Sequence, residues 1–326
     1  MRAVIQREFG GPQVLVVEDV DLPEPAEGEV RVRVAAAGVH AVDTSIRQGD
    51  VPLSMPRPAL PMTPGREVAG TVDAVGPDVD TSLIGTRVVA HVGLRSGGYA
   101  EFAIAPAPAL HTVPDGVPFA QAVAAIGTGR TAQLVLEDAR VQPNDVVIIP
   151  GASGGLGSQL VQLALSIGAV VVALYGGEAK RAVVEGLAPD AERLFALDAM
   201  DESWPSQMAE LLKEREPSLL IDGVGGTTGR AAFETLGRGG RVVIIGWSSG
   251  EAVRIDTDDL VNRSLTATVP LGRPVPQLRE LETRALAAVA DGRVTPPVDE
   301  YPLERAPDAH AAIERRRQRG KVVLIP

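Results

Sequence analysis

The sequence predicts an α/β protein with two domains, one rich in β structure and one built on a doubly wound parallel sheet. Its length of 326 residues suggests about two domains, at roughly 100–200 residues per domain. Up to about residue 118, short segments rich in β-branched residues are separated by glycine and proline. Beyond that point strand-like and helix-like segments alternate, which is typical of a parallel sheet with helices on both faces.

The first third of the chain is predicted to form a barrel-like or sandwich domain. Its expected strands are 2–6, 29–38, 67–76, 86–91 and 99–106. Five prolines fall between Pro52 and Pro64, so that segment is predicted to be a loop. Short strands at this spacing favour a barrel or a sandwich over an open sheet.

The second part of the chain alternates in type. Expected strands are 145–150, 169–175, 193–197, 218–224 and 240–246, and expected helices are 118–139, 157–168, 204–215 and 230–236. After about residue 265 come a proline-bearing connection, a helix over 278–292, a basic helix over 306–320 and a strand over 321–326. We therefore expect a β domain from 1–120, completed by 266–326, and a nucleotide-fold domain from 121–265.

Composition excludes several classes of function. The formal net charge of −11 argues against nucleic acid or an anionic membrane as the main partner. The chain has no cysteine, which excludes disulfides, iron–sulfur clusters and a thiol nucleophile. The sequence shows no signal region and no run of about 20 apolar residues. These features predict a cytoplasmic protein with no membrane or nucleic-acid partner.

The strongest local signal is the glycine-rich turn "PGASGGLG". Gly151, Gly154 and Gly157 lie between a buried strand and an amphipathic helix, as a dinucleotide-binding turn requires. Such a turn lets the backbone approach a pyrophosphate, while the helix start offers free N–H groups. The cofactor-binding residues expected here are Ala152, Ser153, Gly154, Gly155, Leu156 and Gly157. The alternative interpretation is a tight turn that binds nothing.

The end of the next strand favours NADP(H) over NAD(H). An acidic residue there would hydrogen-bond the 2′-hydroxyl of NAD. This strand instead ends with Tyr175 and a glycine, and Lys180 and Arg181 follow. Two cations suit a 2′-phosphate. Glu178, in contrast, is an acidic residue and favours NAD(H). The alternative interpretation of Lys180 and Arg181 is that they form only the solvated start of a helix.

Taken together, the motifs show a resemblance that runs essentially from end to end. They include "FGGPQVL", "GVHAVDTSIRQG", "PGREVAGTVDAVG", "GGYAEFAI", "GASGGLG", "IDGVGG", "GRVVIIGWSSG" and "GKVVLIP". The chain resembles the medium-chain dehydrogenase/reductase superfamily, in particular its zinc-free quinone oxidoreductase branch. The resemblance implies a GroES-like catalytic domain, a Rossmann domain, and a cleft where NADP(H) and substrate meet. It also implies a homodimer formed through the edge of the Rossmann sheet.

The resemblance assigns roles at matching positions. Lys180 matches the 2′-phosphate ligand, and cofactor-side positions are matched by Thr131, Gly246, Ser248 and Arg316. The basic run around Arg316 is open to a second interpretation, as a solvated helix face. Leu197 stands where close relatives have a tyrosine that contacts the cofactor.

Departures from the metal-binding relatives concern two positions. Those relatives place zinc ligands where this chain has His40 and Arg66, so we expect no metal. His40 is the candidate catalytic residue, able to donate a hydrogen bond or a proton near neutral pH. Its alternative role is a turn residue bonded to backbone. Asp43 is expected to cap the turn or a short helix.

The expected activity is NADPH-dependent hydride transfer to a quinone or to an activated C=C bond of a 2-alkenone or alkenal, without zinc. The expected partner is a small electrophilic substrate, with specificity set by 50–64 and 271–277. Some enoyl reductases carry a tyrosine where this chain has Val51, which weakens the interpretation of the chain as an enoyl reductase of acyl thioesters. Two alternatives remain open: a zinc-free alcohol or aldehyde reductase, and a non-catalytic NADPH-binding redox sensor.

Overall fold

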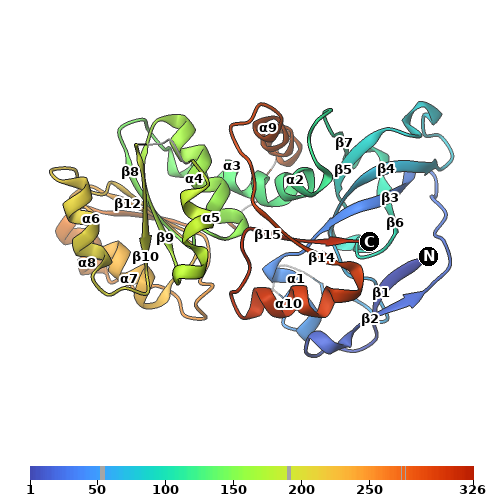
Figure 1. Cartoon of the computed structure of the whole chain (residues 1–326), viewed down its shortest axis with the longest axis horizontal. Helices are drawn as coiled ribbons and strands as arrows, with labels where there is room; N and C mark the ends of the chain where they lie inside the picture. The colour runs from blue at the N-terminus through green and yellow to red at the C-terminus, as the bar shows by residue number, and fades with distance from the viewer. Residues whose placement is uncertain (52–55, 189–191, 273, 276) are drawn as a thin grey trace. The chain divides into compact units, whose positions relative to one another are not determined.

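The computed structural model describes residues 1–51, 56–188, 192–272, 274–275 and 277–326, and the chain forms two compact units (Figure 1). Unit 1 comprises 1–130, 282–291 and 296–326, and unit 2 comprises 131–281 and 292–295. Unit 1 thus extends beyond residue 120, because the helix that follows packs on its strands. Unit 2 extends beyond residue 265, because a further strand joins its sheet.

Unit 1 is the β-rich unit. Its strands are β1 (Arg2–Gln6), β2 (Leu15–Asp19), β3 (Glu29–Gly38), β4 (Glu67–Val75), β5 (Arg87–His91), β6 (Phe102–Pro106), β7 (Leu110–Thr112), β14 (Val298–Pro302) and β15 (Lys321–Ile325). The main sheet has the order β14-β15-β3-β4-β5-β7, with β6 also paired to β3, while β1 and β2 pair separately. The helices are α1 (Ala41–Gln48), α2 (Phe119–Ala124), α10 (Ala306–Glu314) and most of α9 (Leu278–Ala290).

Alternation of side chains builds the core of unit 1. Val30, Val32 and Val34 of β3 all point into one buried cluster, as the two-residue period of a strand requires. The strand bulges opposite β4, and Gly70 fits there because a Cβ would lie 1.9 Å from the Arg33 carbonyl oxygen. This close approach lets β3 and β4 curve together around the core.

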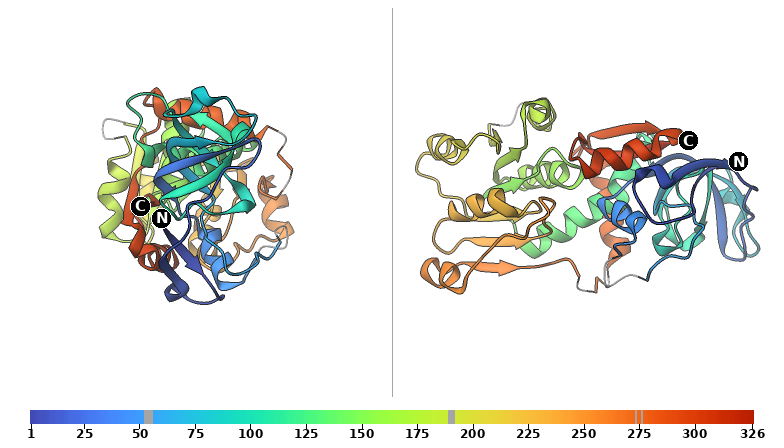
Figure 2. Two further views of the ribbon diagram at one scale, coloured as in Figure 1. Left: turned by 90° about the vertical axis from the view of Figure 1, so that its right-hand side faces the viewer. Right: turned by 90° about the horizontal axis from the view of Figure 1, so that it is seen from below.

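The end of the chain returns to its beginning within unit 1. β15 pairs antiparallel with β3 and parallel with β14, and α10 packs against α1. The C-terminal segment, red in Figure 2, therefore lies beside the blue N-terminal part of the same unit. As a result, residues from both ends of the sequence can contribute to one site.

Two expected helices differ in the structure. The helix over 118–139 is interrupted by a π-helical segment, Ala125–Gly129, between α2 and α3 (Arg130–Ala139). The basic helix expected to reach residue 320 ends at Glu314, because Arg316 adopts a left-handed conformation with φ 53°. The basic run therefore follows α10 rather than forming its face.

Unit 2 is a parallel sheet with the order β10-β9-β8-β11-β12-β13. Its strands are β8 (Val146–Pro150), β9 (Val170–Tyr175), β10 (Leu194–Asp198), β11 (Leu219–Asp222), β12 (Arg241–Ile244) and β13 (Thr266–Thr268). Its helices are α3, α4 (Gly155–Ile167), α5 (Arg181–Glu185), α6 (Trp204–Leu212), α7 (Gly226–Glu234) and α8 (Thr257–Arg263). In chain order the strands run 3-2-1-4-5-6, the doubly wound Rossmann arrangement, which confirms the predicted fold class.

Burial shows that both faces of this sheet are covered. Every residue of β8 and β9 is buried. Val146 and Ile148 pack in one cluster with Trp204 of α6 and Phe233 of α7, whereas α4 contacts β8 and β9 outside that cluster.

The short edge strand β13 lies in the segment that was expected from the sequence to be a connection. None of the helices within the described residues is long and apolar enough to cross a bilayer.

Candidate functional site

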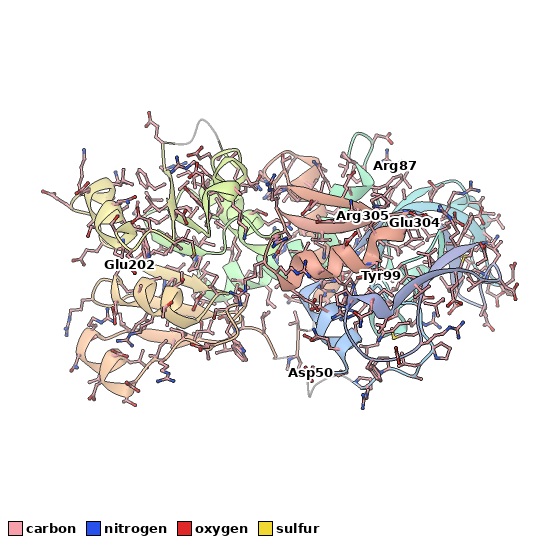
Figure 3. All side chains as sticks on the ribbon, turned by 60° about the horizontal axis from the view of Figure 1, so that its bottom comes forward. Asp50, Arg87, Tyr99, Glu202, Glu304 and Arg305 are labelled. Carbon is pink, nitrogen blue, oxygen red and sulfur yellow. The ribbon has the colours of Figure 1, made fainter. Side chains whose placement is uncertain are left out.

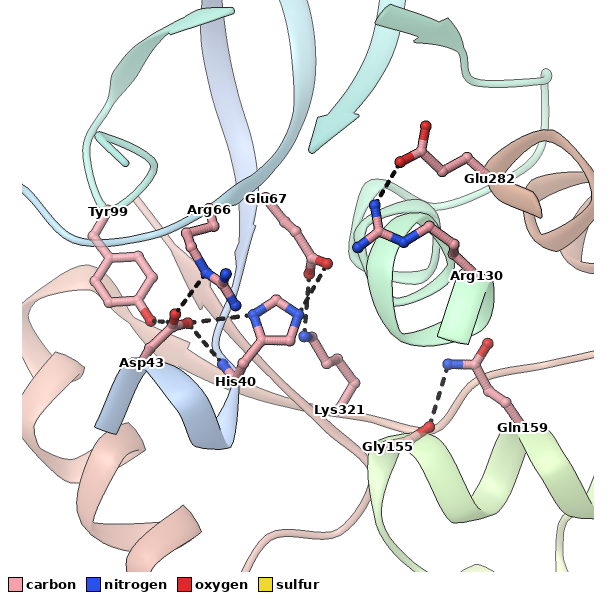
Figure 4. Close-up of polar contacts among 10 residues, drawn as sticks. All are labelled: His40, Asp43, Arg66, Glu67, Tyr99, Arg130, Gly155, Gln159, Glu282 and Lys321. Atoms are coloured by element: carbon pink, nitrogen blue, oxygen red, sulfur yellow. Dashed lines mark hydrogen bonds and ion pairs between the residues drawn. The ribbon is translucent and has the colours of Figure 1, made fainter. Parts of the chain in front are cut away.

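The turn between β8 and α4 has the close packing of a phosphate-binding turn. Gly151 adopts φ +72°, and a Cβ on Gly157 would lie 2.3 Å from the Gly151 carbonyl oxygen. Both positions therefore require glycine. Gly154 caps α4, and Gln159 donates to the Gly155 carbonyl within its first turn (Figure 4). The first N–H groups of a helix lack partners within it, so this helix start can bind an anion.

Predicted cofactor residues meet at one edge of the unit 2 sheet. The glycine turn follows β8, Lys180 follows β9, and Gly246 and Ser248 follow β12. Parallel strands place their carboxyl ends at the same edge, and the crevice there is where doubly wound sheets bind nucleotides. The Ser248 N–H donates to the Gly223 carbonyl oxygen at 3.0 Å, which joins the loops after β11 and β12. Ala152 and Ser153 are buried inside the turn.

The segment after β9 carries the two predicted cations. Lys180 is half-buried at the end of a short 3₁₀ turn, Glu178–Lys180. Arg181 is exposed, and its Nε donates to the Tyr175 hydroxyl at 2.9 Å and lies 3.4 Å from Glu178. Glu178 thus lies against Arg181. The segment offers positive charge from Lys180 and Arg181, while the neighbouring Asp198 carboxylate accepts a hydrogen bond from the Gly177 N–H at 2.9 Å.

The remaining predicted residues lie elsewhere. Thr131 is half-buried at the start of α3, and Leu197 is buried in the core of unit 2. Arg316 belongs to unit 1 and is exposed just after α10. Its guanidinium has no hydrogen-bond or ion-pair partner within the part of the chain that is described. The predicted loops 50–64 and 271–277 include residues outside the described ranges.

In unit 1, His40 and Asp43 form the N-terminal cap of α1. The Asp43 carboxylate accepts from the His40 backbone N–H at 2.9 Å, and the two side chains approach to 3.3 Å through Nδ1 of His40. This capping box confirms the expected role of Asp43 at the helix start. His40 follows the end of β3, so the strand fixes where the cap sits.

The Asp43 carboxylate collects further donors. Its Oδ2 accepts from the Tyr99 hydroxyl at 3.2 Å, and its Oδ1 accepts from Nε of Arg66 at 3.2 Å (Figure 4). Burial by itself would raise the pKa of Asp43, but hydrogen bonding and charge from His40, with the charge of Arg66, hold it well below its usual range. Asp43 is therefore a fixed anion.

A second buried carboxylate lies on the other side of His40. Glu67 is fully buried at the start of β4, with Oε1 2.9 Å from Nε2 of His40 and Oε2 3.1 Å from Nζ of Lys321. Neither oxygen has an aligned hydrogen bond within the described chain, so charge rather than hydrogen-bond geometry stabilises Glu67. Burial would raise the pKa of Glu67, but the charges of His40 and Lys321 hold it well below its usual range. Burial in turn lowers the pKa of Lys321.

We call His40, Asp43, Arg66, Glu67 and Lys321 the ion cluster. Burial would lower the pKa of His40, but the negative charge of Glu67 and the hydrogen bond between His40 and Asp43 raise it above its usual value. The two carboxylates thus favour the imidazolium form of His40, in which each ring nitrogen carries an N–H that faces a carboxylate. Glycines make room for this arrangement: a Cβ on Gly127 of the π-helical segment would lie 1.6 Å from Glu67.

A hydrogen-bond chain ties the ion cluster to α10. Tyr99, labelled in Figure 3, is fully buried, and its oxygen lies 3.3 Å from Nε2 of His310. Nδ1 of His310 lies 3.4 Å from Nη1 of Arg47. The second terminal nitrogen of Arg47, Nη2, pairs with Glu314. Since Tyr99 donates to Asp43, the network assigns the Nε2–H tautomer to His310. Each member thus donates toward Asp43.

Sequence reasoning missed the partners of His40 and Asp43. It did not place Glu67, Lys321 or Tyr99 near His40, and it treated Arg66 only as a missing zinc ligand. A weak signal exists, because a charged residue inside an apolar strand such as "KVVLI" must find a partner if it is buried. Within the described residues, no group of three or more His, Asp or Glu side chains is arranged to hold a metal ion.

The two units offer different chemistry. Unit 2 presents backbone N–H groups, glycines and cations, which suit a phosphate-bearing cofactor. Unit 1 presents a cationic side of the ion cluster, where His40 and Arg66 are partly exposed. Fixed positive charge can stabilise negative charge that develops during a reaction.

Comparisons with known proteins agree with this architecture. Residues 26–115 match the alcohol dehydrogenase GroES-like domain, and residues 196–324 match the zinc-binding dehydrogenase domain. The chain is 32% identical to a quinone oxidoreductase of Sus scrofa, over 100% of this chain and 98% of the relative.

Solved structures agree as well. The chain is similar to a structure described as an NAD-dependent alcohol dehydrogenase (TM-score 0.87, 31% identity) and to Escherichia coli quinone oxidoreductase complexed with NADPH (TM-score 0.82, 28% identity). Both similarities cover 100% of each chain.

Buried neutral histidines predict a loss of stability in mild acid. Burial lowers the pKa of His310 to about 4, with Arg47 adding to the shift and Asp43 opposing it. In the unfolded chain this histidine binds a proton below pH ~6.5, whereas in the folded chain His310 binds one only near its lowered pKa. The free energy of unfolding therefore falls as the pH drops from the first value towards the second. His310→Gln should therefore lose about 2 kcal/mol less stability than the wild type between pH 7.5 and pH 5.

Urea denaturation at the two pH values measures this difference. Burial also lowers the pKa of His91 to about 4, so the variant should keep part of the wild-type acid sensitivity. Equal losses of stability in the two proteins would contradict a neutral, buried His310.

Proposed function

The chain belongs to the quinone oxidoreductase family of the medium-chain dehydrogenase/reductase superfamily, and from this premise we propose that it reduces quinones or activated C=C bonds with NADPH, without zinc. The observation that carries the proposal is the pairing of a glycine turn with cations at one sheet edge in unit 2. When bound, NADPH supplies a hydride. The protein binds and orients the cofactor and the electrophilic substrate.

Cofactor binding is supported by the fit of the turn. Gly151 and Gly157 permit the tight approach of helix and strand that the pyrophosphate site needs. Ala152, Ser153 and Gly154 to Gly157 would surround the pyrophosphate, with Gly246 and Ser248 beside them. Lys180 would bind the 2′-phosphate, since β9 itself ends at Tyr175 and Lys180 follows shortly after it. We assign Thr131 and Arg316 to the cofactor as well, on their family positions.

Independence from zinc is supported by the ion cluster. Both ring nitrogens of His40 face carboxylates, and Arg66 places a permanent positive charge against Asp43. The chain has no cysteine that could serve as a ligand. The positive charge of the ion cluster disfavours the binding of a metal cation at the same place. His40 would act here by holding the cluster together and positioning its neighbours.

A second activity has one specific observation in its favour. The similarity to an NAD-dependent alcohol dehydrogenase covers the whole chain at 31% identity. Zinc-free reduction of aldehydes is therefore the alternative. It would use the same cofactor edge and a carbonyl substrate.

We also propose a homodimer formed through the β13 edge of the unit 2 sheet. β13 is the last strand of that sheet, and two of its three residues are exposed. Val261 of α8 and Val269, which follows β13, are 67% and 55% exposed, as large apolar side chains are at surfaces that bind another protein.

NADPH oxidation against a panel of quinones, 2-alkenones and aldehydes tests the proposed function, with NADH as the second cofactor. The wild type should oxidise NADPH with quinones or enones. Lys180→Ala should weaken NADPH binding about 10- to 100-fold, because it removes a charged hydrogen bond to phosphate, and should leave NADH binding nearly unchanged.

The matched control is Arg215→Ala, which removes an exposed cation of unit 2 elsewhere. It should bind NADPH as the wild type does. Equal weakening of NADPH and NADH by Lys180→Ala would contradict the 2′-phosphate assignment. Turnover with aldehydes alone would favour the alternative activity.

A further inference from the structure

Arg66 is the member of the ion cluster with unused donors. Its Nε donates to Asp43, while its two terminal nitrogens have no hydrogen-bond partner within the described chain. The side chain is 14% exposed, and that of His40 is 18% exposed. The side chains of the other three members are at most 4% exposed; these are Asp43, Glu67 and Lys321. The cluster therefore reaches solvent through Arg66 and His40 alone.

His40 and Arg66 differ in what they can offer there. Both ring nitrogens of His40 lie within 3.3 Å of a carboxylate oxygen, so neither N–H is free for a ligand. Arg66 keeps a planar pair of N–H donors that suits an oxygen atom carrying negative charge. Figure 4 shows Arg66 beside His40 and Asp43, with Asp43 fixing its Nε. The donor pair is therefore held in place before any ligand arrives.

We propose that Arg66 is a catalytic residue that binds the carbonyl oxygen of the acceptor and stabilises the oxyanion formed during reduction. This inference rests on the proposed function. Hydride addition forms a C–H bond at the β-carbon of an enone. The former C=C electron pair then forms the C=C bond of the enolate, and the carbonyl π pair moves onto the oxygen. A quinone likewise ends with negative charge on oxygen. The hydride source leaves as NADP⁺.

The proton must come from another source than Arg66. A guanidinium does not release its proton in proteins, so Arg66 donates hydrogen bonds throughout. Water protonates the enolate or the hydroquinone anion, which completes the balance of one hydride and one proton. The substrate class is thereby narrowed to acceptors whose reducible bond is a carbonyl or is conjugated with one. Isolated alkenes should not react.

Binding of 4-nitrophenol tests the proposal without turnover, because its neutral and ionised forms absorb differently. The ligand is titrated with pH on wild-type protein saturated with NADP⁺. Bound ligand should ionise at a lower pH than free ligand, because Arg66 favours the phenolate. Arg66→Gln should abolish that shift and weaken phenolate binding about 10- to 100-fold. Its kcat with enones should fall about 10²- to 10³-fold, with NADPH affinity unchanged.

Arg7→Gln is the matched control, since it removes an exposed cation of unit 1 that pairs with Glu18. It should behave as the wild type. If Arg66→Gln does not fold, Arg66→Lys keeps the charge but loses the planar donor pair, and it should show a smaller loss in the same direction. Wild-type phenolate affinity and kcat in a folded Arg66 variant would overturn the proposal. A wild type inactive with every quinone and enone would instead contradict the proposed function.

Discussion

The carboxylate of Asp43 is the interaction on which the candidate site of unit 1 depends. It accepts hydrogen bonds from the His40 backbone, the Tyr99 hydroxyl and Arg66, and it lies against the His40 ring. A buried carboxylate is tolerated only with such compensation, and removing one partner of a buried pair typically costs about 3–5 kcal/mol. Asp43 also caps α1, so helix and site share one anchor.

This constraint explains why the end of the chain returns to the first unit. β15 brings Lys321 to Glu67, and α10 brings His310 to Tyr99. Without these segments, Glu67 would lose one of its two close basic partners, and the donor chain behind Asp43 would end at Tyr99. Unit 2 works differently, because its site relies on glycines, backbone N–H groups and a helix start. One unit thus supplies side-chain charge, and the other supplies backbone dipoles.

Local patterns made much of this predictable from the sequence. The run from β8 through the glycine turn to β9 has all its signals within about one βαβ unit, so its fold and its candidate residues could be predicted. The π-helical segment could not, because it reflects the meeting of Gly127 with Glu67, which is distant in sequence. Likewise, Lys321 opens an apolar strand and resembles an exposed residue until its partner is known. The left-handed Arg316 ended a helix that the composition would have continued.

The charge state of His40 tests the account most directly, since the ion cluster requires an imidazolium held by two anions. Nitrogen-15 NMR of histidine-labelled protein at neutral pH reports the protonation of each ring nitrogen, and His40→Gln assigns the signals. We predict that both His40 nitrogens are protonated, whereas the buried His310 carries a proton on Nε2 alone. A neutral His40 with one bare nitrogen would contradict the account, because that nitrogen would then face a carboxylate without a proton between them.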